Sequence, residues 1–184
     1  AYTWDGQPIR PAPRVDIRRE DDSLVVRITS PLYGAAPVEG PPSRRWRLWE
    51  HEVVEVFLAG PDAANGVEYI ELELAPTGHW LALRLRGTRN IIDDNLPVFA
   101  SSLVGETTWT GTLRLSLHDL PPGPLRVLAA AAHGPPDDRR YLAHVPLPAT
   151  SPDFHQLHRF TPIVLEAGVQ GPADSTAAES SREG

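Results

Sequence analysis

Apolar and polar residues alternate with a period of two along most of this chain. The alternation is clear in residues 23–29, 51–58, 68–74, 80–86 and 112–117. A period of two puts successive side chains on opposite faces of an extended strand, whereas no stretch of helical length shows a 3.6-residue pattern. Pro and Gly residues, 20 and 14 in number, separate the runs. We therefore predict an all-β fold, an antiparallel β-sandwich of about nine strands without substantial helix.

One hairpin can be placed in register from its loop. Residues 76–79 separate two alternating runs, and we expect a two-residue turn formed by Thr77 and Gly78. That turn would pair the leucines of both strands on one face of the sheet and would place Glu71 opposite Arg84 on the other. The match of apolar partners supports this register, because a slip of one residue would bury the charged side chains.

The length of 184 residues fits one domain. We assign residues 1–166 to the sandwich and predict that residues 167–184, which are small and polar, form a disordered tail. Residues 31–47 and 87–97 are predicted to be long loops, and a bend at 116–120 to be a single turn of helix. Because long loops often carry function, the Pro-rich residues 31–47 are a candidate for protein binding.

Composition and charge narrow the range of functions. The net charge of −7 and the pI of about 5.4 argue against a nucleic-acid partner, whose phosphates favour clustered Lys and Arg. No apolar run is long enough to span a membrane. The first residues lack the apolar core of a signal peptide, so we expect a cytoplasmic protein, with a trimmed start at Ala1. The absence of Cys excludes disulfides and thiolate metal sites, and the absence of Lys excludes Schiff-base chemistry.

The alternation also places chemically useful side chains on one face. When Val54, Val56 and Leu58 face the core, the opposite face holds Trp49, His51, Glu55 and Phe57. A Trp ring packs against the C–H face of a sugar, while charged groups bind its hydroxyls. Trp49, His51 and Glu55 therefore make a candidate binding surface, although Trp49 also fits a structural plug at one end of a sandwich.

The predicted hairpin adds charged groups to this surface. Glu71 and Arg84 would form a cross-strand pair, with either a structural or a ligand-binding role. Glu55 and Glu73 would repel each other on a covered face unless an Arg or a ligand lies between them, which favours a site here. The pairing with Arg84 would lower the pKa of Glu71 and so oppose a general-acid role.

Metal binding has weak support in this sequence. The His residues lack ligand spacing, so we expect no metal or cofactor, and His51 and His155 with a carboxylate are the one set compatible with a metal. Asp93 and Asp94 stand in an oxygen-rich loop that is compatible with a structural calcium. Asp153 precedes His155 by two residues in a Pro-flanked loop, where an Asp oxygen can instead cap backbone amides.

Several motifs resemble a known family of sandwich domains. The sequence W-E-x-E-x-V-E at residues 49–55 looks like the opening strand of family-nine-type carbohydrate-binding modules and their DOMON-like relatives. YIELELAPTG at 69–78 resembles their hairpin that ends in Pro-x-Gly, and the likeness continues at 105–111 and 152–155. Taken whole, residues 2–166 resemble the branch that includes the human chromosome-4 open-reading-frame-33 product, a branch without an assigned activity.

The resemblance implies a jelly-roll type of sandwich that holds a sugar ring between two Trp side chains. Trp49 matches one of these Trp residues, and Glu55 matches a carboxylate that binds sugar hydroxyls. Glu71 stands at or near the place of an Arg in the sugar-binding members. No second Trp stands at the matching late position, so Phe154 or His155 would have to replace it.

Three functions stay open at this point. We favour a non-catalytic domain that binds a sugar or another small polar ligand on the face described above. Its expected ligand contacts are Trp49, His51, Glu55, Glu71, Glu73, Arg84 and His155. An enzyme that hydrolyses glycosides or esters with the same carboxylates is the second function, since neighbouring strands can hold a catalytic pair. The third is a protein-interaction domain that uses residues 31–47.

Overall fold

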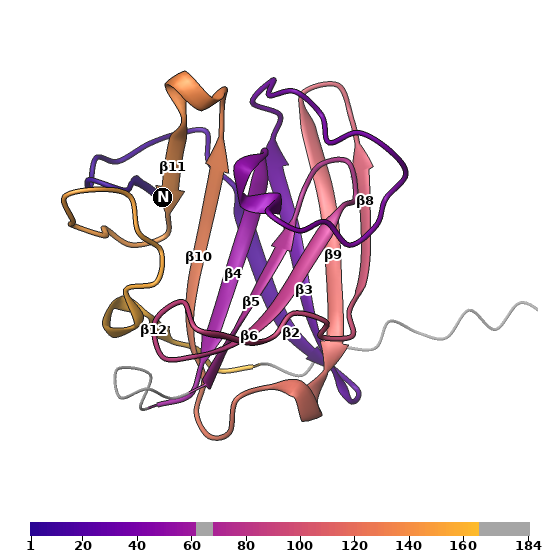
Figure 1. The fold of residues 1–184 in the computed structure, drawn as a ribbon, viewed down its shortest axis with the longest axis vertical. Coiled ribbons are helices and arrows are strands. Elements are labelled where there is room, and N and C mark those ends of the chain that lie inside the picture. The colour runs from indigo at the N-terminus through magenta and orange to yellow at the C-terminus, as the bar shows by residue number, and fades with distance from the viewer. Residues whose placement is uncertain (62–67, 166–184) are drawn as a thin grey trace, which may run out of the picture.

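The computed structural model describes residues 1–61 and 68–165, which form two antiparallel β-sheets packed face to face (Figure 1). The strands of the larger sheet are β1 (Tyr2–Thr3), β4 (Val53–Ala59), β5 (Glu68–Leu74), β6 (Trp80–Arg86), β7 (Ile91–Asp93), β10 (Arg126–His133), β11 (Arg140–Ala143) and β12 (Thr161–Pro162). The strands of the smaller sheet are β2 (Arg14–Glu20), β3 (Ser23–Pro31), β8 (Phe99–Val104) and β9 (Thr108–Ser116). Single turns of 3-10 helix are η1 (Leu48–Glu50), η2 (Leu117–Asp119), η3 (Pro136–Asp138) and η4 (Leu157–Arg159).

The strand order brings distant parts of the chain together. The larger sheet runs β1-β11-β10-β4-β5-β6-β7, with β12 paired to β10, and the smaller sheet runs β2-β3-β9-β8. All of these pairings are antiparallel, and η2 falls within the predicted bend at 116–120. The predicted all-β antiparallel sandwich without substantial helix is therefore confirmed.

The core between the two sheets is built from one face of each central strand. Leu72 from β5 is fully buried there, as are Leu24 from β3 and Leu113 from β9. Burial of such aliphatic side chains stabilises the sandwich by roughly 25 cal/mol per Å² of apolar area. Gly111 on β9 lets the layers approach closely, because a Cβ at this position would lie 2.5 Å from Cδ2 of Leu74.

A second core covers the outer face of the larger sheet. Phe57 on β4 and Tyr69 on β5 belong to it, and both are fully buried. They are covered by residues 144–160, here termed the covering segment, in which Phe154 and Phe160 are buried. This segment lies beside β10 and is drawn in orange to yellow in Figure 1. The central strands β4 and β5 are thus buried on both faces.

The β5–β6 hairpin differs from the predicted register by one residue. Its loop is three residues long and ends at Gly78, whose φ of 81° is the left-handed conformation that such loops require. As a result, Glu71 pairs with Leu83, and Arg84 pairs with Ile70 on the opposite face of the sheet. The predicted cross-strand pair of Glu71 and Arg84 is therefore wrong.

The apolar match did not discriminate between registers because both faces of β6 are buried. Leu83 packs in the second core, while its neighbour Ala82 packs between the sheets. On its own face, the guanidinium of Arg84 lies 3.6 Å from the carboxylate of Glu68 and 3.8 Å from that of Asp119.

The predicted tail and the predicted loop 31–47 differ in what the structure describes of them. The predicted tail, residues 167–184, lies outside the described residues. The loop 31–47 is fixed by Glu52, whose carboxylate accepts hydrogen bonds of 3.2 and 3.3 Å from the backbone N–H groups of Tyr33 and Ala35. Its use in protein binding stays a prediction.

In the part of the chain that the structure describes, no helix has the length and apolar character needed to cross a membrane.

Candidate functional site

Three carboxyl groups form a row on the outer face of the larger sheet, within the second core. Glu55 on β4 pairs directly with Glu73 on β5, and Glu71 precedes Glu73 by two residues on the same face. The exposed fractions of Glu55, Glu71 and Glu73 are 4%, 4% and 0%. Like charges directly opposite each other destabilise a sheet, so this row is costly when its carboxyl groups are ionised.

Burial changes the protonation of this row. Loss of hydration raises the pKa of Glu71 to about 7. Burial first, and the neighbouring carboxyl groups second, raise the pKa values of Glu55 and Glu73 well above their usual range. At neutral pH the row therefore holds protons in place of a full set of negative charges. The expectation that Arg84 lowers the pKa of Glu71 is wrong, because Arg84 lies on the opposite face.

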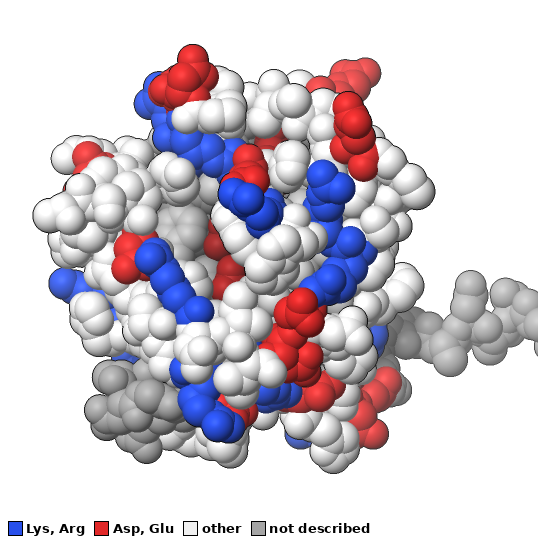
Figure 2. Space-filling view, viewed as in Figure 1, with Lys and Arg blue, Asp and Glu red and all other residues white. Residues whose placement is uncertain are grey.

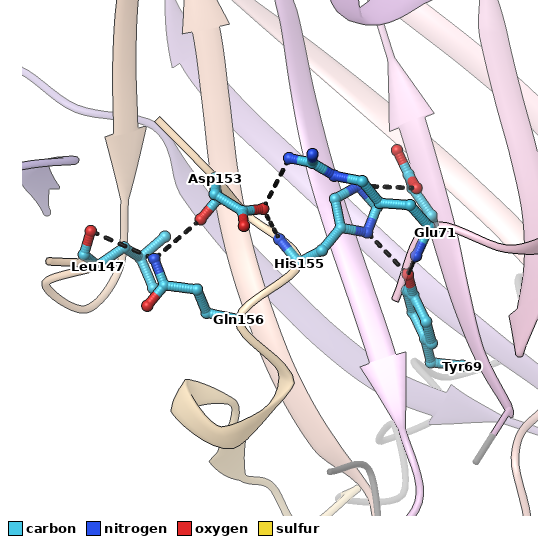
Figure 3. A network of polar contacts seen from close by, with 7 residues as sticks. Tyr69, Glu71, Leu147, Asp153, His155 and Gln156 are labelled. Carbon is cyan, nitrogen blue, oxygen red and sulfur yellow. Dashed lines mark hydrogen bonds and ion pairs between the residues drawn. The ribbon is translucent and has the colours of Figure 1, made fainter. Parts of the chain in front are cut away.

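His155 from the covering segment meets this row beside Tyr69 (Figure 3). The Tyr69 hydroxyl lies 2.7 Å from Nδ1 of His155 and accepts a 3.0 Å hydrogen bond from the backbone N–H of Arg89. We assign the hydroxyl hydrogen to the bond with Nδ1, which places the ring hydrogen on Nε2, 3.9 Å from Oε2 of Glu71. Burial lowers the pKa of His155 to about 4, so its ring is neutral at pH 7.

Asp153 fixes the loop that carries His155. Its Oδ1 accepts hydrogen bonds of 2.9 Å from the backbone N–H of His155 and from the guanidinium of Arg89. Its backbone carbonyl accepts a 3.3 Å bond from Nε2 of Gln156, which also lies 3.4 Å from the carbonyl of Leu147 (Figure 3). The predicted turn, in which an Asp oxygen caps a backbone amide, is confirmed.

A cavity of about 360 Å³ adjoins the row, a volume within the range of small-molecule sites. Its aromatic and polar lining consists of Trp49, Glu55, Glu71, Arg89, Tyr141, Asp153, Phe154 and His155. Figure 2 shows a hollow near the middle of this face, with acidic atoms inside it and both acidic and basic side chains around it. The cavity thus combines apolar rings with buried carboxyl groups and a cation.

Trp49 reaches the cavity from η1 and not from a strand. Since β4 begins only at Val53, the predicted alternation does not extend back to Trp49 and His51. The guanidinium of Arg139 holds this turn by donating hydrogen bonds to the backbone carbonyls of Trp49, at 2.7 Å, and of His51. Trp46 is 46% exposed and meets the Trp49 ring edge-on at 5.3 Å between centroids.

The structure brings together some of the predicted contact residues and separates others. Those that line the cavity are Trp49, Glu55, Glu71 and His155. Glu73 lies in the same row without lining the cavity, whereas His51 lies after η1 and Arg84 on the other face of the sheet. For all of these residues, contact with a ligand stays a prediction.

Sequence reasoning missed three residues that shape the site. Tyr69 positions His155, Arg89 binds Asp153, and Arg139 holds the turn that carries Trp49. Arg89 has a φ of 61°, a left-handed conformation that is uncommon for Arg and that no sequence pattern predicted. Nothing in the sequence marked Arg139.

The candidate calcium loop has other contacts in this structure. Oδ1 of Asp93 accepts a 2.9 Å hydrogen bond from the backbone N–H of Asn95, and the carboxylate of Asp94 lies 2.7 Å from the guanidinium of Arg44. Within residues 1–61 and 68–165, no group of three or more His, Asp or Glu side chains is arranged to hold a metal ion. A structural calcium stays a prediction.

Comparison with solved structures shows the fold. A crystal structure from Bacteroides uniformis, described as "a putative carbohydrate-binding protein", superposes with a TM-score of 0.71 over 90% of this chain and 84% of that chain. The sequence identity is 15%, so the likeness concerns the fold alone.

Comparison with known sequences shows the family. No family model matches the chain. The UPF0462 protein C4orf33 homolog of Mus musculus is 34% identical over 172 residues, which cover 88% of each chain. The human UPF0462 protein C4orf33 is 34% identical over 86% of this chain and 83% of its own, and the Danio rerio homolog is 30% identical over 90% and 87%. The branch predicted from the motifs is confirmed, and the chain belongs to the UPF0462 C4orf33 family.

Proposed function

We propose that this protein is a small-ligand-binding domain and that its ligand is a carbohydrate or a similar polyhydroxylated molecule. The observation that carries the proposal is the cavity lined by Trp49, Glu55, Glu71 and Arg89. An aromatic ring provides a surface for the C–H face of a sugar. Carboxyl groups and a guanidinium provide both acceptors and donors for hydroxyl groups.

The protonated state of the carboxyl row suits such a ligand. A neutral carboxyl group both donates and accepts a hydrogen bond, as a sugar hydroxyl does. Because Glu55 and Glu71 are buried, bulk water competes little with a ligand hydroxyl for hydrogen bonds to their carboxyl groups. The fold shared with the Bacteroides uniformis protein supports the proposal through the description given to that protein.

Thermal unfolding in the presence of mono- and oligosaccharides tests this proposal. A ligand at 100 times its dissociation constant should stabilise the protein by about 2.7 kcal/mol, which corresponds to a rise in Tm on the order of 5 °C. The Trp49→Ala variant should lose this rise, because the aromatic wall of the cavity is removed. The Trp4→Ala variant, outside the cavity lining, should keep it. A sugar-induced rise that survives in Trp49→Ala would place the ligand elsewhere.

The raised pKa of Glu71 favours a second candidate function, hydrolysis of a glycoside or an ester. A carboxyl group with a pKa of about 7 can donate a proton to a leaving group at neutral pH, and Glu55 lines the same cavity as a potential partner. Aryl glycosides and aryl esters provide a sensitive assay for turnover. Turnover that disappears in Glu71→Gln while ligand affinity survives would establish the enzyme, and a lack of turnover with both substrate classes would discard it.

A further inference from the structure

The cavity has more acidic groups than cations to balance them. The guanidinium of Arg89 is paired with Asp153 at 2.9 Å. Arg139 directs its N–H groups to the backbone carbonyls of Trp49, His51 and Gly134. Among the described residues, no Arg guanidinium lies within 4 Å of the carboxyl groups of the row formed by Glu55, Glu71 and Glu73. The charges of Arg139 and Arg89 act on Glu55 and Glu71 only from farther away, so the row has no ion-pair partner at contact distance among the described residues.

Glu73 is the most extreme member of the row. Its side chain is completely buried, and its carboxyl group has a hydrogen bond only with the neighbouring carboxyl group of Glu71, through a proton held between them, among the described residues. A buried polar group without partners costs about 1–3 kcal/mol, and an ionised one costs more. Such a row reaches charge balance in one of two ways. It holds protons, or a cation enters beside it.

The aromatic lining of the same cavity points to the cation independently of the carboxyl groups. Trp49, Tyr141 and Phe154 all line the space that Glu55 and Glu71 reach. The faces of aromatic rings attract ammonium groups, most strongly where water is excluded. Rings and carboxyl groups around one cavity form the combination that recognises an amine.

We propose that the ligand of this cavity carries an ammonium group, placed between the aromatic wall and the carboxyl groups of Glu55 and Glu71, as in an amino sugar with a free amine. This inference rests on the proposed binding function and names the ligand class. The ammonium supplies the cation that the row lacks, and the hydroxyl groups of the same molecule bind toward Arg89 and Asp153. The cavity of about 360 Å³ suits a ligand of this kind.

Binding of an ammonium should release protons from the row. The charged and titratable groups that face Glu71 are Glu73 on its own strand, Glu55 on β4, Arg89 after β6, Tyr69 on β5, and Asp153 and His155 on the covering segment. The guanidinium of Arg139, which is bonded to backbone carbonyls, acts on Glu55. His155 is neutral and Arg89 is paired, so the carboxyl groups are the source of protons. An ammonium stabilises the ionised carboxylates, so its binding competes with protons. Below pH 7, the affinity for the ammonium ligand should therefore increase about tenfold for each unit by which the pH is raised, per proton released.

Isothermal titration calorimetry with D-glucosamine, N-acetyl-D-glucosamine and D-glucose tests the inference. Titrations at pH 6 and pH 7, in two buffers of different ionisation enthalpy, report the protons released. We expect D-glucosamine to bind about tenfold or more tightly than the two neutral sugars and to release protons. Glu71→Gln should remove both effects. Glu68→Gln should keep them, because the carboxylate of Glu68 pairs with Arg86 outside the cavity lining.

The outcomes separate this inference from the proposed function. Equal, Trp49-dependent binding of the amino and neutral sugars without proton release overturns the inference and leaves the proposed function standing. Binding of D-glucosamine that is unchanged in Glu71→Gln also overturns it, because the amine then does not bind against the carboxyl group of Glu71. If no sugar of either kind binds in a Trp49-dependent way, the proposed function fails and the inference fails with it.

Discussion

Replacement of Glu71 by Gln should make the protein more stable, relative to the wild type, as the pH is raised. Between pH 5 and pH 8, the difference in free energy of unfolding should shift by on the order of 3 kcal/mol in favour of the variant. The pKa of Glu71 is about 7 in the folded protein, against 4.5 as the ordinary value. Between these two values the folded state binds the proton and the unfolded state does not, so the free energy of unfolding falls as the pH rises. Above pH 7 both states are ionised, and the full cost of the buried charge remains. Gln does not titrate, so the variant escapes this loss.

Urea denaturation of the wild type and of Glu71→Gln, from pH 5 to pH 8, measures this difference. Burial lowers the pKa values of His133 and His155 to about 4, which makes stability rise with pH up to about 6.5, but both proteins share this contribution. The control Glu68→Gln should not gain stability between pH 5 and pH 8, because an Arg neighbour holds the pKa of Glu68 low. Parallel curves for the wild type and Glu71→Gln would contradict a buried neutral carboxyl group.

Replacement of Phe57 by Ala should reduce the free energy of unfolding by about 3–5 kcal/mol. The ring of Phe57 is completely buried and lies within 5.3–6.5 Å, between centroids, of the rings of Phe154, His155 and Phe160. It therefore joins the larger sheet to the covering segment. Its loss leaves a cavity in the second core and weakens the contact that holds one wall of the ligand site.

Phe99→Ala provides the matched control, because Phe99 on β8 is 64% exposed. Its free energy of unfolding should stay within about 0.5 kcal/mol of the wild type, as is usual for surface positions. Both variants are compared by urea denaturation at pH 7. A loss of less than about 1 kcal/mol in Phe57→Ala would show that the covering segment adds little to the stability of the sandwich.

The fold class followed from the sequence because alternation with a period of two is a local property of each strand. The register of the β5–β6 hairpin did not follow, because the discriminating signal disappears when both faces of a sheet are apolar. Leu83 and Ala82 are neighbours in sequence and both are buried, one in each core. The number of loop residues then decided the register, and Gly78 fitted the longer loop as well as the shorter one.

From the sequence, the candidate site could be predicted only for residues that share one face of a sheet. Glu55 and Glu71 lie on the outer face of the larger sheet, and the motif resemblance pointed to His155 as a residue that could face Trp49. Trp49 was placed on a strand that begins four residues after it, at Val53. Contacts such as that between His155 and Tyr69 span 86 positions, and no local pattern encodes them.

The covering segment has a consequence for how ligand preference can change in this family. One wall of the cavity is a strand face whose residues also pack the sheet, so a substitution there affects both sandwich stability and recognition. The opposite wall, with Phe154 and His155, belongs to irregular chain that pairs with no strand. Loops tolerate insertions and exchanges far better than the strands they connect. Exchange between relatives of the residues of this segment that line the cavity, with the fully buried Phe160 kept, is thus a direct route to new specificity.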